Sequence, residues 1–193
     1  MGYRKDMNVK GSALTSAQIA QAERLLGTAP FAYMAMVEPG GPYVLPLNFV
    51  YVSEGLIGPE AASAGDTPPV GRPLAPASGG LDGRIYFHTG EGRKTAALAT
   101  DPRVCLAVTG GVIFEQGDTP CADGFAYRSL LIWGRARRLM EEDRRRLALR
   151  AIVTKYDPGA VDTPLDEADL GQTLVFEVTI EAASYKERPR PGA

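Results

Sequence analysis

The segment at residues 173–181 constrains the fold most strongly, because apolar Leu174, Phe176, Val178 and Ile180 recur at every second position, with Glu177, Thr179 and Glu181 between them. Strict alternation is typical of a strand that buries one face and exposes the other. Five further runs rich in apolar or β-branched residues are separated by Pro, Gly and Asp, and they lie at residues 31–37, 43–52, 84–89, 103–109 and 127–140. The sequence therefore predicts six strands, most of them connected as antiparallel neighbours.

Three helices are expected beside these strands. Thr15 and Gln18 have the spacing of a capping box, and Gly27 fits the stop of that first helix. A short helix follows residue 92, and another is expected at residues 141–156. We therefore expect a mainly β (α+β) fold with flanking helices, in which the strands form a closed or nearly closed barrel because closure removes exposed edges.

Two features qualify this arrangement. Pro46 falls inside the second predicted strand and cannot donate to a strand ladder, which predicts an edge strand or a bulge there. Residues 57–83 are rich in Pro, Gly, Ala and Ser, which indicates an irregular insertion between the second and third strands. We expect the whole chain, residues 1–193, to form a single domain that contains this insertion.

Composition excludes several classes of function. The chain has 193 residues, 45% of them hydrophobic, and a net charge of −2, so it has no general electrostatic attraction for nucleic acid. It has no apolar run of membrane-spanning length, and residues 1–6 lack the apolar core of a signal peptide, so a cytoplasmic location is expected. One His and two scattered Cys predict no metal site.

Residues 84–94 carry the strongest functional signal: a strand, a glycine turn, and a helix that opens with Arg93 and Lys94. Cations are unfavourable at a helix N-terminus, where unpaired N–H groups carry partial positive charge. A bound anion reverses that argument, because helix N-termini and basic side chains together bind phosphate. The alternative is that both cations extend into solvent.

Three motifs in the chain stand together as a recognisable set. The first is Ile85-Tyr86-Phe87-His88-Thr89, followed by Gly92-Arg93-Lys94, Leu98 and Asp101-Pro102-Arg103-Val104. The second is Tyr127-Arg128-Ser129-Leu130, leading to Gly134-Arg135-Ala136, and the third is Gly41-Pro42-Tyr43 to Pro46, with Phe49-Val50-Tyr51. With these motifs the chain resembles the FMN-binding split-barrel superfamily, which includes the pyridoxamine 5′-phosphate oxidases. The resemblance implies a six-stranded, mostly antiparallel split β-barrel over most of the chain.

The resemblance also implies FMN as cofactor. Arg93 and Lys94 match the basic pair that holds the phosphate, while Phe87 and His88, with Thr89 at the end of their strand, match positions beside the ribityl chain and phosphate. Ser129 matches a polar position that reaches the cofactor. The strand whose backbone runs along the flavin ring corresponds to Leu45, Pro46, Leu47, Asn48, Phe49 and Val50.

Departures from the pyridoxamine-phosphate oxidase pattern narrow the expected activity. Leu45 and Val50 stand where those oxidases carry cations, and residues 182–193 lack their Arg/His substrate motif. The chain therefore resembles the nitroimidazole-resistance reductase-like branch more closely. The resemblance implies a homodimer that oxidises or reduces a small molecule, with a nicotinamide nucleotide as candidate electron donor.

Catalytic groups are not evident from the sequence. His88, the sole histidine, is the candidate for proton transfer, although a packed or phosphate-contacting role fits its strand position better. The lack of an evident acid/base pair leaves a non-catalytic flavin-binding or sensing module as an alternative. A relative that uses deazaflavin or haem is another.

Overall fold

The computed structural model describes residues 13–53, 80–160 and 162–188. Within these residues the helices are α1 (Ser16–Thr28), α2 (Arg93–Thr100), α3 (Glu142–Tyr156) and α4 (Glu167–Gln172). The strands are β1 (Ala32–Glu38), β2 (Gly41–Leu47), β3 (Val50–Val52), β4 (Arg84–Thr89), β5 (Arg103–Glu115), β6 (Gly124–Arg138) and β7 (Leu174–Arg188). The insertion predicted at 57–83 lies outside the described residues as far as residue 79.

All described strands join one antiparallel sheet in the order β2-β1-β5-β6-β7-β4-β3. The mainly β architecture is confirmed, but the count of six strands was wrong and the sheet is not closed. The second predicted strand, residues 43–52, divides at Asn48 and Phe49, so that β2 pairs with β1 while β3 pairs with β4. Pro46 lies in β2 at the sheet's edge, as its missing donor predicted.

Phe49 shows why this strand divides. Its backbone N–H donates a hydrogen bond to the Tyr156 hydroxyl at 3.0 Å rather than to a neighbouring strand. That hydroxyl donates in turn to the Pro30 carbonyl at 2.7 Å. The last residue of α3 therefore satisfies the backbone where the chain passes from one edge of the sheet to the other.

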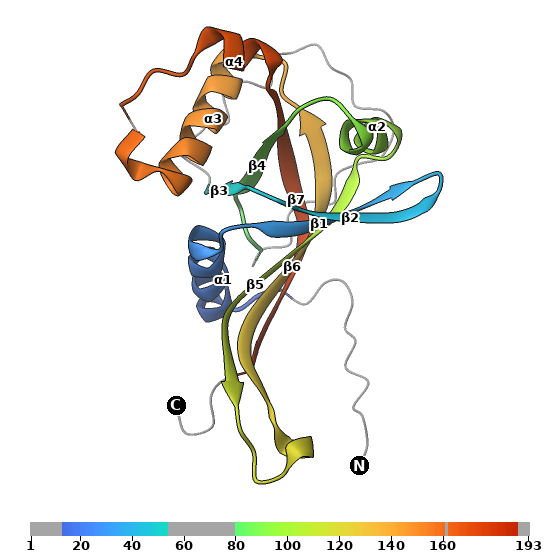
Figure 1. Ribbon diagram of the computed structural model, residues 1–193, viewed down its shortest axis with the longest axis vertical. Helices are drawn as coiled ribbons and strands as arrows, with labels where there is room; N and C mark the ends of the chain where they lie inside the picture. The colour runs from blue at the N-terminus through green and yellow to red at the C-terminus, as the bar shows by residue number, and fades with distance from the viewer. Residues whose placement is uncertain (1–12, 54–79, 161, 189–193) are drawn as a thin grey trace.

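The strands predicted at residues 103–109 and 173–181 are longer than the sequence indicated, because β5 continues to Glu115 and β7 to Arg188. Strand β6 begins at Gly124, before the predicted residue 127, and pairs there with the end of β5. The register shifts between Gly110 and Ile113, and Gly111 has a φ of 62°. The glycines thus form a bulge within a continuing hairpin. This hairpin extends away from α3 and α4, which lie at the opposite end of the molecule (Figure 1).

The predicted helices are present with corrected ends. The Thr15–Gln18 capping box forms, with Thr15 Oγ1 accepting from the Gln18 N–H at 3.2 Å. Gly27 does not end α1: the helix runs to Thr28, and Ala29 closes it by donating to the Leu25 carbonyl at 2.9 Å. Helix α4 was not predicted from the sequence. No helix in the described part of the chain combines the length and apolarity needed to cross a membrane.

The core has two parts, one on each side of β4. Ile85 and Phe87 face the larger part, where Phe87 stacks on Phe176 with ring centroids 5.2 Å apart. Tyr86 faces the smaller part, beneath α3. The buried Glu177 anchors this second part, since it accepts from Tyr86 Oη at 2.9 Å and Arg144 Nη2 at 2.8 Å. Helix α3 is thereby fastened to the strand that leads to α2.

Candidate cofactor site

Arg93 and Lys94 are the first two residues of α2, as predicted. Gly92 precedes them with a φ of 154°, a conformation that favours glycine. The N–H of Gly92 donates to Thr95 Oγ1 at 3.0 Å, which caps the helix from within. A tight turn therefore connects β4 to α2, and the two cations begin this helix, whose buried residues are Ala97 and Leu98.

Arg93 is held across the site by a residue that the sequence did not indicate. Its Nε donates to Glu38 Oε2 at 2.9 Å, and Nη2 pairs with the other carboxylate oxygen. The guanidinium also lies over the Tyr43 ring, 4.3 Å from its centroid. The Arg93 guanidinium holds the pKa of the Glu38 carboxyl below its usual value. A carboxylate thus already occupies the anion-binding face of Arg93.

Lys94 turns toward the end of β4. Its Nζ donates to Thr89 Oγ1 at 3.1 Å, and burial lowers its pKa. His88 precedes Thr89 on β4 and is an exposed residue; partial desolvation of its ring and then the charge of Lys94 lower its pKa. Thr89 and Lys94 therefore form one polar pair at the start of α2, whereas the side chain of His88 projects from the opposite face of β4.

The predicted residues of the β2–β3 segment divide between two environments. Leu47, Phe49 and Val50 are buried, as is Phe87 on β4, so their side chains belong to the core. Pro46 and Asn48 are exposed, and Leu45 is half-buried against the core.

Ser129 is not brought to the basic pair within one chain. It pairs with Lys186 on β7, whereas His88 pairs with Val175 on the same strand. These partners are eleven positions apart, which corresponds to roughly 35 Å of strand at about 3.3 Å per residue. The single chain thus brings Lys94 and Thr89 together but leaves Ser129 far from them.

Sequence reasoning missed Glu38 and Tyr43. Tyr43 belongs to the third family motif but was not identified as a site residue, and Glu38 carried no local signal, because it lies 55 positions before Arg93 and adjoins the Pro-Gly turn that follows β1. The hairpin register of β1 and β2 pairs Glu38 with Gly41 and places both new residues beside α2. Only that pairing brings their side chains to the cations.

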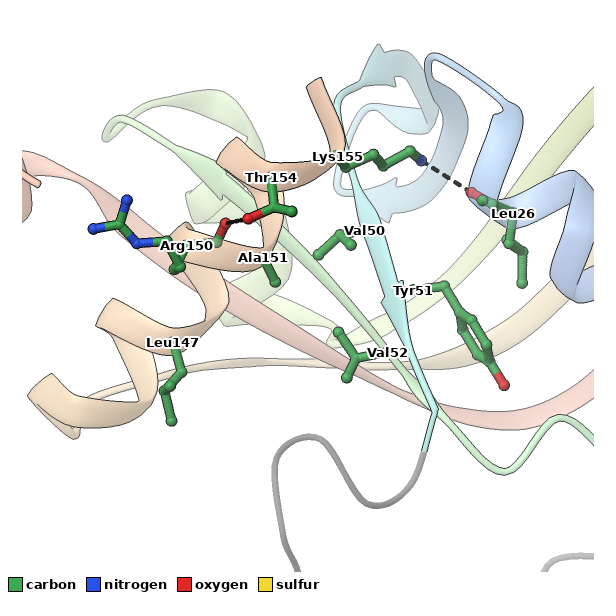
Figure 2. A pocket seen from close by; sticks show the side chains of 10 residues that line it. Leu26, Val50, Tyr51, Val52, Leu147, Arg150, Ala151, Thr154 and Lys155 are labelled. Carbon is green, nitrogen blue, oxygen red and sulfur yellow. Dashed lines mark hydrogen bonds between the residues drawn. The ribbon is translucent and has the colours of Figure 1, made fainter. Parts of the chain in front are cut away.

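A separate groove lies between α1, β3 and α3 (Figure 2). Of the residues predicted to bind cofactor, Val50 is the one that lines it. The described side chains include no cluster of three or more His, Cys, Asp or Glu that could hold a metal ion.

The fold of this chain is similar to that of several solved structures. A flavocytochrome from Azotobacter vinelandii is 22% identical, with a TM-score of 0.65 over 92% of this chain and 69% of its own. A FAD- and haem-binding protein from Mycobacterium smegmatis is 21% identical, with a TM-score of 0.64 over 87% and 70%. A Bacteroides thetaiotaomicron protein assigned to 5-nitroimidazole antibiotic resistance is 18% identical, with a TM-score of 0.60 over 91% and 88%.

These similarities define the class of fold, a split barrel of the pyridoxamine 5′-phosphate oxidase type. The family model for pyridoxamine 5′-phosphate oxidase matches residues 18–187. The chain belongs to that family, which confirms the resemblance of its motifs. No curated protein matches the chain.

Proposed function

We propose that this protein binds FMN and uses it to oxidise or reduce a small molecule. The observation that carries the proposal is the start of α2, where Lys94 donates to the Thr89 hydroxyl and Arg93 is the first residue of the helix. Such a set suits a phosphate, which accepts several charge-assisted hydrogen bonds at once. The flavin-binding relatives of the same fold support this choice of ligand.

The residues present fit the phosphate end of FMN. Lys94 Nζ is already directed to Thr89 Oγ1, so both groups converge on one point. Arg93 is oriented by Tyr43 and Glu38, and its exposed guanidinium turns from the carboxylate to a ligand phosphate. When bound, flavin supplies hydride or electron transfer, while the protein supplies position and electrostatics.

His88 is the candidate for moving a proton in this site. Its lowered pKa keeps the ring neutral near pH 7, so one ring nitrogen can accept a proton while the other donates a hydrogen bond. Because a neutral His88 carries no charge, Arg93 and Lys94 are the residues that balance the negative charge of the phosphate. We propose a small-molecule substrate and a nicotinamide nucleotide as the electron donor.

We propose further that the working unit is a homodimer. The outward face of β1, β5 and β6 carries the register row Tyr33, Ala107 and Leu131, and beside it Ala35, Cys105 and Trp133. Tyr33 is 50% exposed and Leu131 is 39% exposed, so this face is apolar and accessible. A second copy packed here buries it and supplies a Ser129 from outside the chain, which explains why Ser129 lies far from its own basic pair.

The experiment is an equilibrium titration of the flavin-free protein with FMN and with riboflavin, which lacks the phosphate. For Arg93→Ala combined with Lys94→Ala we expect at least tenfold weaker FMN binding, since each charge-assisted contact is worth about 1.5–3 kcal/mol. Riboflavin binding is expected to stay unchanged. Mass identification of any ligand released from the purified protein distinguishes FMN from FAD and deazaflavin.

Arg103→Ala is the matched control, because this exposed cation pairs with Asp101 away from the site. Its FMN affinity is expected to equal that of the wild type. Equal FMN affinity in the folded Arg93/Lys94 double variant refutes the phosphate assignment. Failure of any nicotinamide nucleotide to reduce the bound flavin favours the non-catalytic binding module.

Haem is the second candidate cofactor, since two of the similar structures are a flavocytochrome and a FAD- and haem-binding protein. His88 is the chain's one histidine and thus its one imidazole ligand for haem iron. A Soret band in the purified protein that is lost in His88→Ala supports haem. A flavin spectrum without that band excludes it.

A further inference from the structure

The groove between α1, β3 and α3 has the dimensions of a small-molecule site. Its volume is about 460 Å³, within the range of pockets that bind small ligands. Val50 and Val52 of β3 face Ala151 and Leu147 of α3 across it (Figure 2). Leu147 is 51% exposed, so an apolar surface remains open to a ligand.

One face of α3 forms a wall of this groove. The wall begins at Leu147, continues through Ala151 and ends at Lys155, which is the four-residue spacing of one helix face. At 1.5 Å of rise per residue, these positions span about 12 Å. The whole wall, with Lys155 included, therefore has about the length of a carboxylate with eight carbon atoms.

Lys155 closes one end of the groove with a cation. Its Nζ donates to the Leu26 carbonyl at 3.0 Å and lies 3.6 Å from the centroid of the Phe49 ring. The ion pairs among the described residues do not include Lys155. An ammonium has three N–H donors. The Leu26 carbonyl and the Phe49 ring each take one of them, so the third can bind a ligand.

The charge of the lining favours an anion. Within the described residues, the lining of the groove contains the cations Arg150 and Lys155 but no acid. Arg150 donates to the carbonyls of Ala160 and Thr163, on the side away from Lys155. Lys155 is thus the cation that can bind a ligand lying along the apolar wall of the groove.

We propose that this groove binds a small apolar carboxylate, with the carboxylate on Lys155 and the hydrocarbon part along Ala151, Val52 and Leu147. Burial of the hydrocarbon supplies affinity, and the ammonium supplies preference for the anion. This site goes beyond the proposed flavin chemistry, because the cations of the cofactor site, Arg93 and Lys94, do not line the groove.

The experiment compares octanoate with 1-octanol, which has the same chain length and no charge, by calorimetric titration of the full chain. We expect octanoate to bind about tenfold more tightly than 1-octanol, the ratio that one partly buried ion pair provides. Lys155→Met is expected to remove this preference, and Lys155→Arg to keep it. Ala151→Leu fills the groove and is expected to weaken both ligands.

Arg146→Met is the matched control, because it removes a cation from the same helix outside the groove. Its octanoate affinity is expected to equal that of the wild type. Equal affinity for octanoate and 1-octanol, unchanged binding in a folded Lys155→Met variant, or no octanoate binding at all overturns the proposal. Displacement of octanoate by FMN overturns it as well, since the groove then belongs to the cofactor site. The titration without flavin is independent of the cofactor assignment.

Discussion

Replacing Glu177 with Ala tests whether the smaller core is fastened by one buried carboxylate. Glu177 is 4% exposed and lies opposite both Tyr86 on β4 and Arg137 on β6 in the sheet register. It accepts from the Tyr86 hydroxyl at 2.9 Å, from Arg144 at 2.8 Å and from Arg137 at 3.1 Å. The substitution leaves a buried hydroxyl and a mostly buried guanidinium without this acceptor.

The magnitude follows from the burial of each partner. Tyr86 is 2% exposed, so its bond to a charged acceptor contributes about 1.5–3 kcal/mol. The Arg144 side chain is 18% exposed, so its ion pair with Glu177 is largely buried. The Arg137 side chain is 60% exposed, so its ion pair with Glu177 contributes at most about 1 kcal/mol. We expect Glu177→Ala to lower the free energy of unfolding by about 3–5 kcal/mol.

The assay is urea unfolding followed by circular dichroism, at one protein concentration and without flavin, because self-association and ligands shift apparent stability. Arg137→Ala serves as control and is expected to cost no more than about 1 kcal/mol. A double-mutant cycle of Tyr86→Phe with Glu177→Gln isolates the hydroxyl bond. A loss below about 1 kcal/mol for Glu177→Ala, or an equal loss for Arg137→Ala, refutes the reasoning.

Three further outcomes are expected. Glu38→Gln removes the charge that competes for Arg93, so FMN is expected to bind more tightly while riboflavin binding stays the same; weaker FMN binding would show instead that Glu38 positions Arg93 for the phosphate. Leu131→Asp places a charge on the outward apolar face and is expected to give a monomer by light scattering, and a dimer that survives it contradicts the proposed interface. Burial lowers the pKa of Lys155 to about 8, so the folded chain releases this proton before the unfolded chain does. The free energy of unfolding of the wild type should then rise relative to Lys155→Met above pH 8, and parallel curves in urea titrations at several pH values exclude this linkage.

The site was predictable where its signal was local. The strand, turn and helix of residues 84–94 follow one another in the chain, and a pair of cations at a helix start is visible without a fold. Glu38 gave no such signal, since a carboxylate beside a turn is ordinary in any sequence. Ser129 matched a family motif, yet the register of β6 on β7 separates it from the basic pair by the length of a strand.

By itself, the sequence determined the elements: alternation indicated a strand at residues 173–181, and Thr15 with Gln18 fixed where α1 begins. These features depend on residues within a few positions of one another, so a short stretch of sequence is enough to predict them. Only the tertiary structure decided that residues 43–52 divide between two edges of the sheet, that Glu38 meets Arg93, and that α3 closes a groove over β3. Each of these depends on the choice among distant partners, which is set by burial and backbone pairing over the whole chain rather than by any one segment.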